Sequence, residues 1–521
     1  MPSKTPPSRS LRNRSSRKFT KMALDVTASK AKKRRLSPET QDDTIEKNEH
    51  PAKINRRHEL AKSTVPATTK ARVKGRATVS QRAAPDPVIN KAPADVLTVL
   101  VFGNGDNGEL GLGPQQREAL RPRVNPYFDP HDPSKFHVVQ IACGGMHTVA
   151  LTATNDIVTW GVNDNYALGR DTHWDETLRD IDFDSDDGEL NPLESCPAKI
   201  PAEHFPPETR FVQVAAGDSC SFVLTETGLV YGWGTFRDSN GDERFGYDSE
   251  GGLVRKQKTP VLIQGVQKVT QIACGVNHVL ALDVAGNIWA WGSNEQNQFG
   301  RRLFGRDQDN LRPHQVRVCR NNAKYVASGE YHSFAVDRHD NVWAWGLNSY
   351  GEAGYTKTAG ANSAILPYPR KISSLCGKSV IALAGGAHHS AAVTDDGQCL
   401  VWGRMDGGQL GISFTPQQQE DSTLIRFNDR NQPAICLRPT LVPEIGHAVW
   451  VACGTDHTIF VNKDGSAYAS GFGSEGQLGL GSTDDAEVAQ LIKGQALKDK
   501  VLTWAGAGGQ FSIVAGPASI R

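Results

Sequence analysis

Five histidines recur at one position of an internal repeat, and they are the residues of this sequence best suited to chemistry. They are His147, His278, His332, His389 and His457. An imidazole can bind a metal ion or act as a general base. Each of these histidines belongs to a different copy of the repeat, so they lack the spacing of a metal cluster. We therefore expect each imidazole to make a structural hydrogen bond.

Motifs for covalent catalysis do not occur in the sequence. It has no complete Gly-x-x-x-x-Gly-Lys-Ser/Thr loop, no Cys-x-x-Cys pair and no Gly-x-Ser-x-Gly nucleophile elbow. Of the nine cysteines, Cys143, Cys274 and Cys453 share one repeat position, as small core residues do. Disulfides are therefore not expected, and a reducing compartment fits this pattern. The sequence predicts an interaction platform without cofactor or metal rather than an enzyme with covalent chemistry.

Two residues separate a glycine from the recurring histidine position, and this pair differs from copy to copy. The seven pairs are Gly145-Met146, Asp218-Ser219, Val276-Asn277, Glu330-Tyr331, Ala387-His388, Thr455-Asp456 and Gly509-Gln510. By symmetry they lie on one face, around a central channel. A structural role would favour uniform side chains, so this variable face is the predicted binding surface.

One copy of the repeat has a longer loop than the others. In the other copies a second glycine follows the marker glycine after eight residues, but the partner of Gly234 is Gly246, twelve residues later. The extra residues lie in the segment 236–245, where Asn240-Gly241 is a strong hairpin signal. We expect a small β-hairpin with an exposed tip. The alternative is a neutral surface insertion.

The repeat itself must position these residues. Its first half is exemplified by Ile141–Thr148, and its second half ends in Trp160-Gly161. The residue before the marker glycine follows the histidine position by 13 residues in six copies, whereas the distance between copies varies from 54 to 73 residues. Alternating apolar residues and turns such as Asp464-Gly465 indicate β-hairpins. A unit that is rigid inside and variable in its outer connections is typical of a propeller or solenoid.

The seventh copy is divided between the two ends of the repeat region. Phe511 occupies its histidine position, but the chain ends before a second half can follow. Val99–Asp106 is a second half without a first half. Joining the two completes one blade and removes the exposed sheet edges. The predicted fold is all-β, a seven-bladed β-propeller over residues 96–517 closed by its N- and C-terminal strands.

The segment 1–95 has a different composition from the rest of the chain. It holds 23 Lys+Arg and 9 Asp+Glu, against 35 and 48 in the remainder. With few apolar residues, it is predicted to be a disordered basic arm. Lys30, Lys32, Lys33, Arg34 and Arg35 form a compact run typical of a nuclear import signal or a nucleic-acid patch, with a solvated charge run as the alternative. A basic arm on an acidic body suggests two different partners.

Other segments are informative in a weaker way. The segment 171–189 holds nine acidic residues and is interpreted as a solvated acidic loop. The segment 301–320 holds six arginines and two aspartates, and it could contact phosphate or an acidic protein patch. No apolar stretch is long enough to predict a membrane span, and the N-terminus does not resemble a secretory signal.

The repeat resembles that of the regulator of chromosome condensation family. Ala-Cys-Gly-x-x-His-Thr and Trp-Gly-x-Asn carry the resemblance over about residues 96–517, and the chain looks like a fungal-type homologue. Such propellers also occur in unrelated proteins, including some ubiquitin ligases. More specific is the segment 234–241, which resembles the family's β-wedge. The resemblance implies a chromatin-bound guanine nucleotide exchange factor for the small GTPase Ran, in which the wedge presses on the GTPase near its nucleotide.

The resemblance also implies roles for individual residues. The GTPase-binding face would comprise Asp106, His147, Asp218, Asn277, His388 and Asp456, with Asn277 standing where the animal protein has an acid. The wedge would comprise Phe236, Arg237, Asp238, Ser239, Asn240 and Gly241, and histone contacts would come from Arg301, Arg302, Arg306 and Arg312. The expected partners are Ran, histones, DNA and, through the arm, importin, and the expected location is nuclear chromatin. The alternative is a nuclear propeller adaptor without exchange activity.

Overall fold

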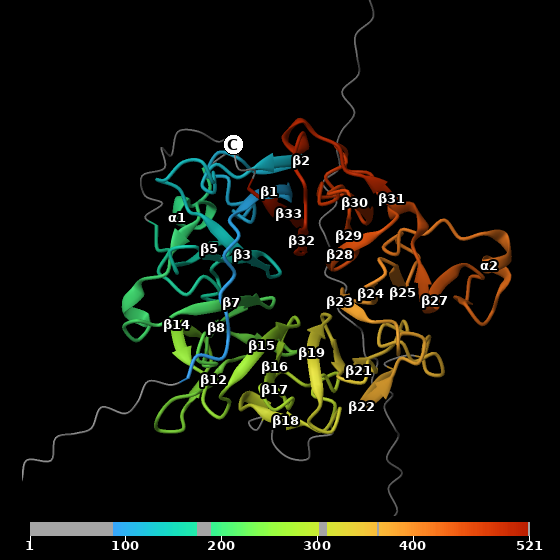
Figure 1. Ribbon diagram of the computed structural model, residues 1–521, viewed down its shortest axis with the longest axis horizontal. Helices are drawn as coiled ribbons and strands as arrows, with labels where there is room; N and C mark the ends of the chain where they lie inside the picture. Colours follow the sequence, from blue (N-terminus) through green and yellow to red (C-terminus); the bar gives the residue numbers. More distant parts are fainter. Residues whose placement is uncertain (1–86, 175–188, 302–309, 362–363, 519–521) are drawn as a thin grey trace, which may run out of the picture. The chain divides into compact units, whose positions relative to one another are not determined.

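The computed structural model describes residues 87–174, 189–301, 310–361 and 364–518. The proposed nuclear signal at residues 30–35, most of the acidic loop 171–189, and Arg302 and Arg306 lie outside these ranges. Within them, the chain forms seven sheets of four or five strands and two short two-stranded ribbons. Figure 1 shows the seven sheets as blades around a centre. The predicted seven-bladed β-propeller is confirmed.

Each blade is an antiparallel meander, and the blades are numbered here in the order of the repeats. Blade 1 contains β3 (Val138–Cys143), β4 (His147–Thr152), β5 (Ile157–Gly161) and β6 (Ala198–Lys199). Blade 2 contains β7 (Phe211–Ala216), β8 (Cys220–Thr225), β9 (Val230–Gly234) and β14 (Gln257–Leu262). Blade 3 contains β15 (Val269–Cys274), β16 (His278–Asp283), β17 (Ile288–Gly292) and β18 (His314–Val316). Blade 4 contains β19 (Ala323–Ser328), β20 (His332–Asp337), β21 (Val342–Leu347) and β22 (Ile365–Lys371).

The remaining blades follow the same order, with one extra strand in blade 5. Blade 5 contains β23 (Val380–Gly385), β24 (His389–Thr394), β25 (Cys399–Arg404), β27 (Pro433–Leu441) and, at its edge, β26 (Ile425–Phe427). Blade 6 contains β28 (Ala448–Cys453), β29 (His457–Asn462), β30 (Ala467–Gly471) and β31 (Ala486–Leu491). Blade 7 contains β32 (Trp504–Ala507), β33 (Phe511–Pro517), β1 (Leu97–Asn104) and β2 (Glu118–Val124).

Helices contribute little to this fold. The α-helices are α1 (Pro192–Ser195) and α2 (Pro416–Glu420), and single 3-10 turns lie at Ala202–His204, Pro443–Ile445 and Gln495–Leu497. Among the described residues, no helix has the length and apolar character needed to cross a membrane.

The constant spacing of 13 residues follows from the pairing of the two middle strands of each blade. His147 lies opposite Gly161 in the hairpin of blade 1, so Trp160 precedes the paired glycine. Gly161 has a φ of +100°, and a Cβ atom there would approach the Cα atom of His147 to 2.7 Å. Glycine is the residue that tolerates both the dihedral angle and this close approach.

Neighbouring blades are joined by a repeated hydrogen-bond chain, which we call the latch. In each latch, the histidine Nε2 of one blade lies 2.8–2.9 Å from a serine or threonine hydroxyl of the next: His147–Ser221, His278–Ser333, His332–Ser390, His389–Thr458 and His457–Ser512. The hydroxyl donates in turn to a loop carbonyl of the preceding blade, as Ser390 does to Glu352. The Trp402 indole N–H donates to the same carbonyl.

The latch fixes the protonation state of its histidine. Because the hydroxyl donates its own hydrogen to the carbonyl, it must accept the hydrogen bond that Nε2–H donates, which fixes the tautomer. Nδ1 of His278, His332, His389 and His457 has no hydrogen-bond partner among the described residues, and burial favours the neutral imidazole. Burial lowers the pKa of His278, His332 and His389 to about 3 and that of His147 and His457 to about 4. The expected structural role of the five histidines is confirmed.

The ring closes through a strand pair from opposite ends of the propeller. Strand β1 pairs with β33 in an antiparallel register that runs from Leu97 opposite Pro517 to Gly103 opposite Phe511. The apolar side chains of Val99, Leu100 and Val101 are fully buried. The predicted completion of one blade from both ends is thereby confirmed.

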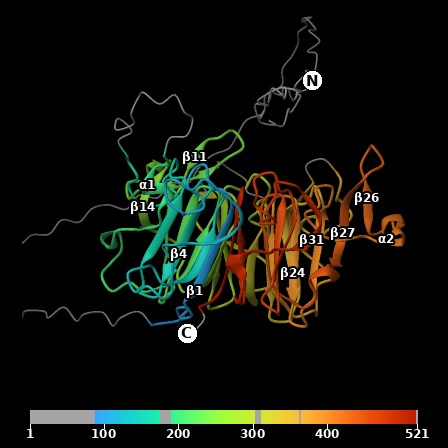
Figure 2. The ribbon, with the colours of Figure 1, turned by 90° about the horizontal axis from the view of Figure 1, so that it is seen from above.

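A short strap precedes β1 and belongs structurally to the propeller. The amide N–H groups of Ile89 and Asn90 donate to the Glu226 carbonyl, and Asn90 Nδ2 contacts the carbonyls of Thr225 in blade 2 and Val269 in blade 3. The sequence-based boundary at residue 95 therefore lies too late, because residues 89 and 90 already bind the propeller. Figure 2 shows this strap at the end of the blades opposite β11 (Glu243–Arg244).

The buried histidines predict a loss of stability in weak acid. Their pKa values are near 6.5 in the unfolded chain and lie at about 3–4 in the folded one, so unfolding takes up as many as five protons between these values. The stabilisation is complete above pH 6.5 and is lost as the pH falls, by about 1.4 kcal/mol per pH unit for each proton. Denaturant titrations at pH 7, 6 and 5 measure this slope. His332→Gln should reduce it by about one proton, and equal stability of the wild type at pH 7 and pH 5 would contradict the assignment.

Candidate functional site

The loops that carry the variable pairs are joined by backbone hydrogen bonds around the channel. The N–H group of Asp218 donates to the carbonyl of Val276, whose own N–H donates to Glu330. Further around the ring, the N–H groups of Glu330, Ala387 and Gly509 donate to the carbonyls of Gly386, Thr455 and Gly145, respectively. Because main-chain atoms hold these loops together, their side chains can vary without loss of the fold. This arrangement supports the expectation that the pairs form a binding surface.

Acidic side chains occur at several points of this face. Asp218 is half-buried and its Oδ2 accepts a hydrogen bond from Ser219 Oγ at 3.0 Å. Asp106 is exposed, in a turn held by the hydrogen bond from its N–H to Asn104 Oδ1. Glu330 lies in the blade 4 loop, where burial raises the pKa of its carboxyl group to about 7. A face of this kind attracts a positively charged partner surface.

A second group of polar side chains spans blades 4, 5 and 6. His388 Nδ1 lies 3.5 Å from Glu352 Oε1, and the His388 ring is tilted against Tyr350 with centroids 4.8 Å apart. Arg404 pairs with Asp456 at 3.4 Å and its guanidinium lies over the Tyr350 ring. The structure therefore brings the predicted residues His388 and Asp456 into one connected network.

His147 does not belong to this surface. Its side chain is 1% exposed, and its Nε2 is committed to Ser221 in the latch. The expectation that it lies on the GTPase-binding face is therefore wrong: the conserved spacing of the repeat places every histidine of this series beneath the loops. Asn277 is half-buried, and its Oδ1 accepts a hydrogen bond from the Arg237 amide at 2.8 Å.

The long loop of blade 2 forms the predicted hairpin, which we call the wedge. Strands β10 (Phe236–Arg237) and β11 pair in antiparallel register, with Arg237 opposite Glu243. The turn is a five-residue loop, 238–242, rather than a two-residue Asn-Gly turn. The Asp238 carboxylate organises it by accepting the N–H groups of Asn240 and Asp242, and Gly241 has a φ of +82°. A second ribbon, β12 (Gly246–Tyr247) and β13 (Leu253–Val254), follows.

The base of the wedge is an aromatic stack. Phe236 and Phe245 are 2% and 5% exposed, and their rings are almost parallel with centroids 5.8 Å apart. Both stack against Phe222, which meets Trp291 of blade 3 edge-on at 5.8 Å. Phe236 is thus an anchor of the wedge in the core, and the tip residues 238–241 are the part available for contact.

The wedge stands at one of the two junctions without a histidine latch; the other is between blades 7 and 1, where Phe511 takes the histidine position and Thr148 Oγ1 has no partner among the described residues. In four loops, the carbonyl that accepts the tryptophan N–H of the next blade lies two residues before the second glycine, as Ala167 does before Gly169. The equivalent residue here is Arg244, which is paired within the hairpin. Accordingly, Trp291 Nε1 has no hydrogen-bond partner among the residues that the structure describes. The other two latch positions hold Cys220 instead of histidine and Val279 instead of serine. Every part of the latch is therefore replaced at this junction.

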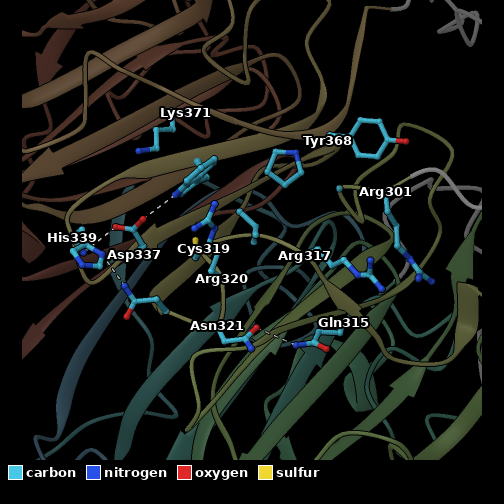
Figure 3. A pocket seen from close by; sticks show the side chains of 15 residues that line it. Arg301, Gln315, Arg317, Cys319, Arg320, Asn321, Asp337, His339, Tyr368 and Lys371 are labelled. Atoms are coloured by element: carbon cyan, nitrogen blue, oxygen red, sulfur yellow. Dashed lines mark hydrogen bonds between the residues drawn. The ribbon is translucent and has the colours of Figure 1, made fainter.

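A basic groove lies between the outer strands of blades 3 and 4 (Figure 3). It has a volume of about 1340 Å³, and its cationic side chains are Arg301, Arg317, Arg320 and Lys371. Cys319, Arg320 and Asn321 all have positive φ, from 47° to 58°, which is uncommon for consecutive residues with side chains. Of the predicted chromatin contacts, Arg301 lines this groove, while Arg312 lies over the Tyr247 ring.

Sequence reasoning missed three residues of the face. Glu330 was part of a variable pair but was not assigned a role, and Glu295 lies in a loop that has ordinary length. Arg404 had a usable signal, because it is the only charged residue directly after a marker glycine. Within the described ranges, no group of three His, Cys, Asp or Glu side chains is arranged to hold a metal ion. All nine cysteines are free thiols.

Comparison with known proteins gives consistent results. A family model described as the RCC1-like domain matches residues 98–514. The guanine nucleotide exchange factor SRM1 of Saccharomyces cerevisiae is 37% identical over 436 residues, covering 81% of this chain and 87% of that protein. The crystal structure of Prp20p from S. cerevisiae, studied with its binding to Gsp1p and histones, aligns with a TM-score of 0.74 and 34% identity over 82% of this chain and 93% of that one. The structure of Kap60 bound to yeast RCC1 (Prp20) also gives 0.74, with 33% identity over 87% and 97%.

The missing latch predicts a difference between two equivalent tryptophans. Trp402→Phe removes an indole that donates to Glu352 at 2.8 Å and leaves that carbonyl with one partner fewer. Trp291→Phe removes a buried donor that has no partner among the described residues. Because an unsatisfied buried donor costs about 1–3 kcal/mol, Trp291→Phe should destabilise the protein less than Trp402→Phe by a similar amount. Chemical denaturation of both variants measures the difference, and equal losses would show that Trp291 has a partner in solution.

Proposed function

This chain belongs to the RCC1-like domain family, whose model spans residues 98–514, and from that premise we propose that it is a guanine nucleotide exchange factor for Ran. The observation that carries the proposal is the wedge, a hairpin with an exposed tip on the face that presents the variable pairs. SRM1, its relative at 37% identity, is named as an exchange factor.

The proposed mechanism requires no covalent step from this chain. The face with Asp106, Asp218 and Asp456 attracts a basic surface of the GTPase and speeds their encounter. The wedge tip then displaces the GTPase segments that hold the phosphates and magnesium. Because the protein binds the nucleotide-free GTPase more tightly than the loaded form, it lowers the barrier to release, and an abundant nucleotide can enter.

Asp218→Ala tests this mechanism. The carboxylate is not needed by the fold, because the equivalent residues in other blades include Gly145, Val276 and Thr455. The free energy of unfolding should fall by no more than ~1 kcal/mol. Nucleotide release should lose about 2 kcal/mol or more of transition-state stabilisation, which lowers its rate roughly 30-fold. Release of a fluorescent guanine nucleotide from Ran measures the effect. Asp395→Ala is the matched control, because Asp395 is an exposed acid in the hairpin at the opposite end of blade 5. An inactive wild type with the fold intact would instead favour a nuclear propeller adaptor.

We further propose that the protein acts on nuclear chromatin, held there by the basic arm and by the basic groove. The relative Prp20p was studied for its binding to histones, and the structure of Kap60 with yeast RCC1 supports importin as a partner that brings such a protein to the nucleus. In the groove, Arg317 and Arg320 are exposed and lie near Lys371 without an acidic side chain bonded to either arginine among the described contacts. This arrangement suits phosphate groups or an acidic protein patch.

The double variant Arg317→Glu/Arg320→Glu tests the contribution of the groove. It should weaken nucleosome binding by about tenfold or more and make the remaining affinity less dependent on salt, because fewer counterions are released. Gel-shift titrations at 50 and 200 mM salt measure both effects. Nucleotide release from Ran in solution should be unchanged. Undiminished nucleosome binding would remove the groove from the proposal and leave the arm alone.

A further inference from the structure

The tip of the wedge is held by a carboxylate from the neighbouring blade. Ser239, the second residue of the loop 238–242, donates its backbone N–H to Glu295 Oε2 at 2.8 Å and its hydroxyl to Glu295 Oε1 at 2.7 Å. The two bonds use different oxygen atoms of one carboxylate. Hydrogen bonds to an ionised acceptor are stronger than neutral ones, and a two-point contact also fixes orientation.

The base of the wedge is attached to the same blade. Asn277 accepts the Arg237 amide, and a Cβ atom at Gly292 would approach the Phe236 ring to 3.1 Å. Asn277, Gly292 and Glu295 all belong to blade 3, whereas the wedge is inserted in the chain of blade 2. The wedge therefore bridges the junction between blades 2 and 3, which lacks a latch, and blade 3 sets the direction in which its tip points.

The length of the Glu295 side chain matters for this contact. Glu295 lies three residues after its marker glycine, and the equivalent residues of blades 1, 5 and 7 are Asp164, Asp406 and Asp106. A glutamate extends one methylene further than these aspartates, and here it reaches the neighbouring hairpin. Asp238 organises the loop internally, but without the Glu295 contact the tip would be free to move relative to blade 3, and fixing its direction on a partner would cost conformational entropy.

We propose that Glu295 is a positioning residue for nucleotide exchange, which holds the wedge tip in the conformation that engages the GTPase. The Ser239 contacts show that Glu295 holds the tip, and the effect of this contact on nucleotide release rests on the proposed function. It assigns to blade 3 a part in exchange that the wedge sequence alone does not reveal. Asn277 has the supporting role of fixing the first strand of the hairpin.

The experiment compares Glu295→Asp, Glu295→Ala and Ser239→Ala with a control, Glu250→Ala, in the full-length protein. Glu250 is an exposed acid in the turn of the β12–β13 ribbon, outside the wedge. Hydrogen exchange of the peptide covering residues 236–245 is measured by mass spectrometry without the GTPase. Steady-state release of a fluorescent guanine nucleotide from Ran then gives kcat and KM separately.

Glu295→Asp and Glu295→Ala should both accelerate hydrogen exchange in the wedge and lower kcat about fivefold, with KM within about twofold, because the lost hydrogen bonds affect displacement more than docking. Ser239→Ala should have a smaller effect that does not add to that of Glu295→Ala. Glu250→Ala should resemble the wild type in both measurements. Glu295→Asp keeps the charge, so it separates positioning from electrostatic attraction.

Three results would overturn the proposal. Unchanged hydrogen exchange in Glu295→Ala would show that the carboxylate does not hold the wedge, whether or not the protein is active. Faster hydrogen exchange with unchanged kcat would show that the contact does not affect nucleotide exchange. A defect confined to Glu295→Ala and to KM would assign the residue to electrostatic attraction. A wild-type protein without release activity would refute the proposed function instead. The hydrogen-exchange result would still test whether Glu295 holds the wedge tip.

Discussion

The hydrogen bond between a buried neutral histidine and the hydroxyl of the next blade is the interaction on which this structure depends. An apolar blade can slide on its neighbour, because hydrophobic packing has little directional preference. The latch supplies direction, since the histidine, the hydroxyl, a loop carbonyl and, in most blades, a tryptophan must meet at one point. His332, Ser390, Glu352 and Trp402 form one complete example. Each such point fixes the angle between two blades. The β1–β33 pair then closes the ring, so that neither strand is left as an unpaired edge.

This constraint separates the fold from the function. The latches lie beneath the loops of one face, so the side chains above them are free to serve binding, as Asp218 and Asp456 are proposed to do. At the junction of blades 2 and 3 the histidine and the hydroxyl of the latch are replaced, and the residue at the position of the accepting carbonyl, Arg244, is paired within the wedge. The aromatic stack of Phe222, Phe236 and Phe245 replaces the hydrogen bonds with apolar contact. The place where the repeat is broken is thus the place where the surface gains a projecting hairpin.

Much of this architecture could be predicted because it is periodic. The fixed spacing from His147 to Trp160 reflects a strand register, and the divided seventh copy reflects ring closure. The site was harder to predict, because its contacts join segments from different blades and have no period. The pairing of Ser239 with Glu295 and of Arg404 with Asp456 depends on which loops become neighbours. The family resemblance placed His147 on the face in error, whereas its recurrence at one position of the repeat correctly indicated a structural hydrogen bond. The strap at Asn90 was missed because two backbone N–H groups and one amide side chain make the attachment, and such contacts leave no periodic pattern in the sequence.

We propose that the tip of the wedge promotes nucleotide release and is not needed for the stability of the propeller. The most direct test removes four residues from its tip, so that the loop of blade 2 regains the eight-residue glycine spacing of the other blades. Release of a fluorescent guanine nucleotide from Ran is then measured alongside binding to nucleotide-free Ran. We expect release to slow far more than binding weakens, with a cooperative melt retained. Release at the wild-type rate by the shortened protein would contradict the proposal.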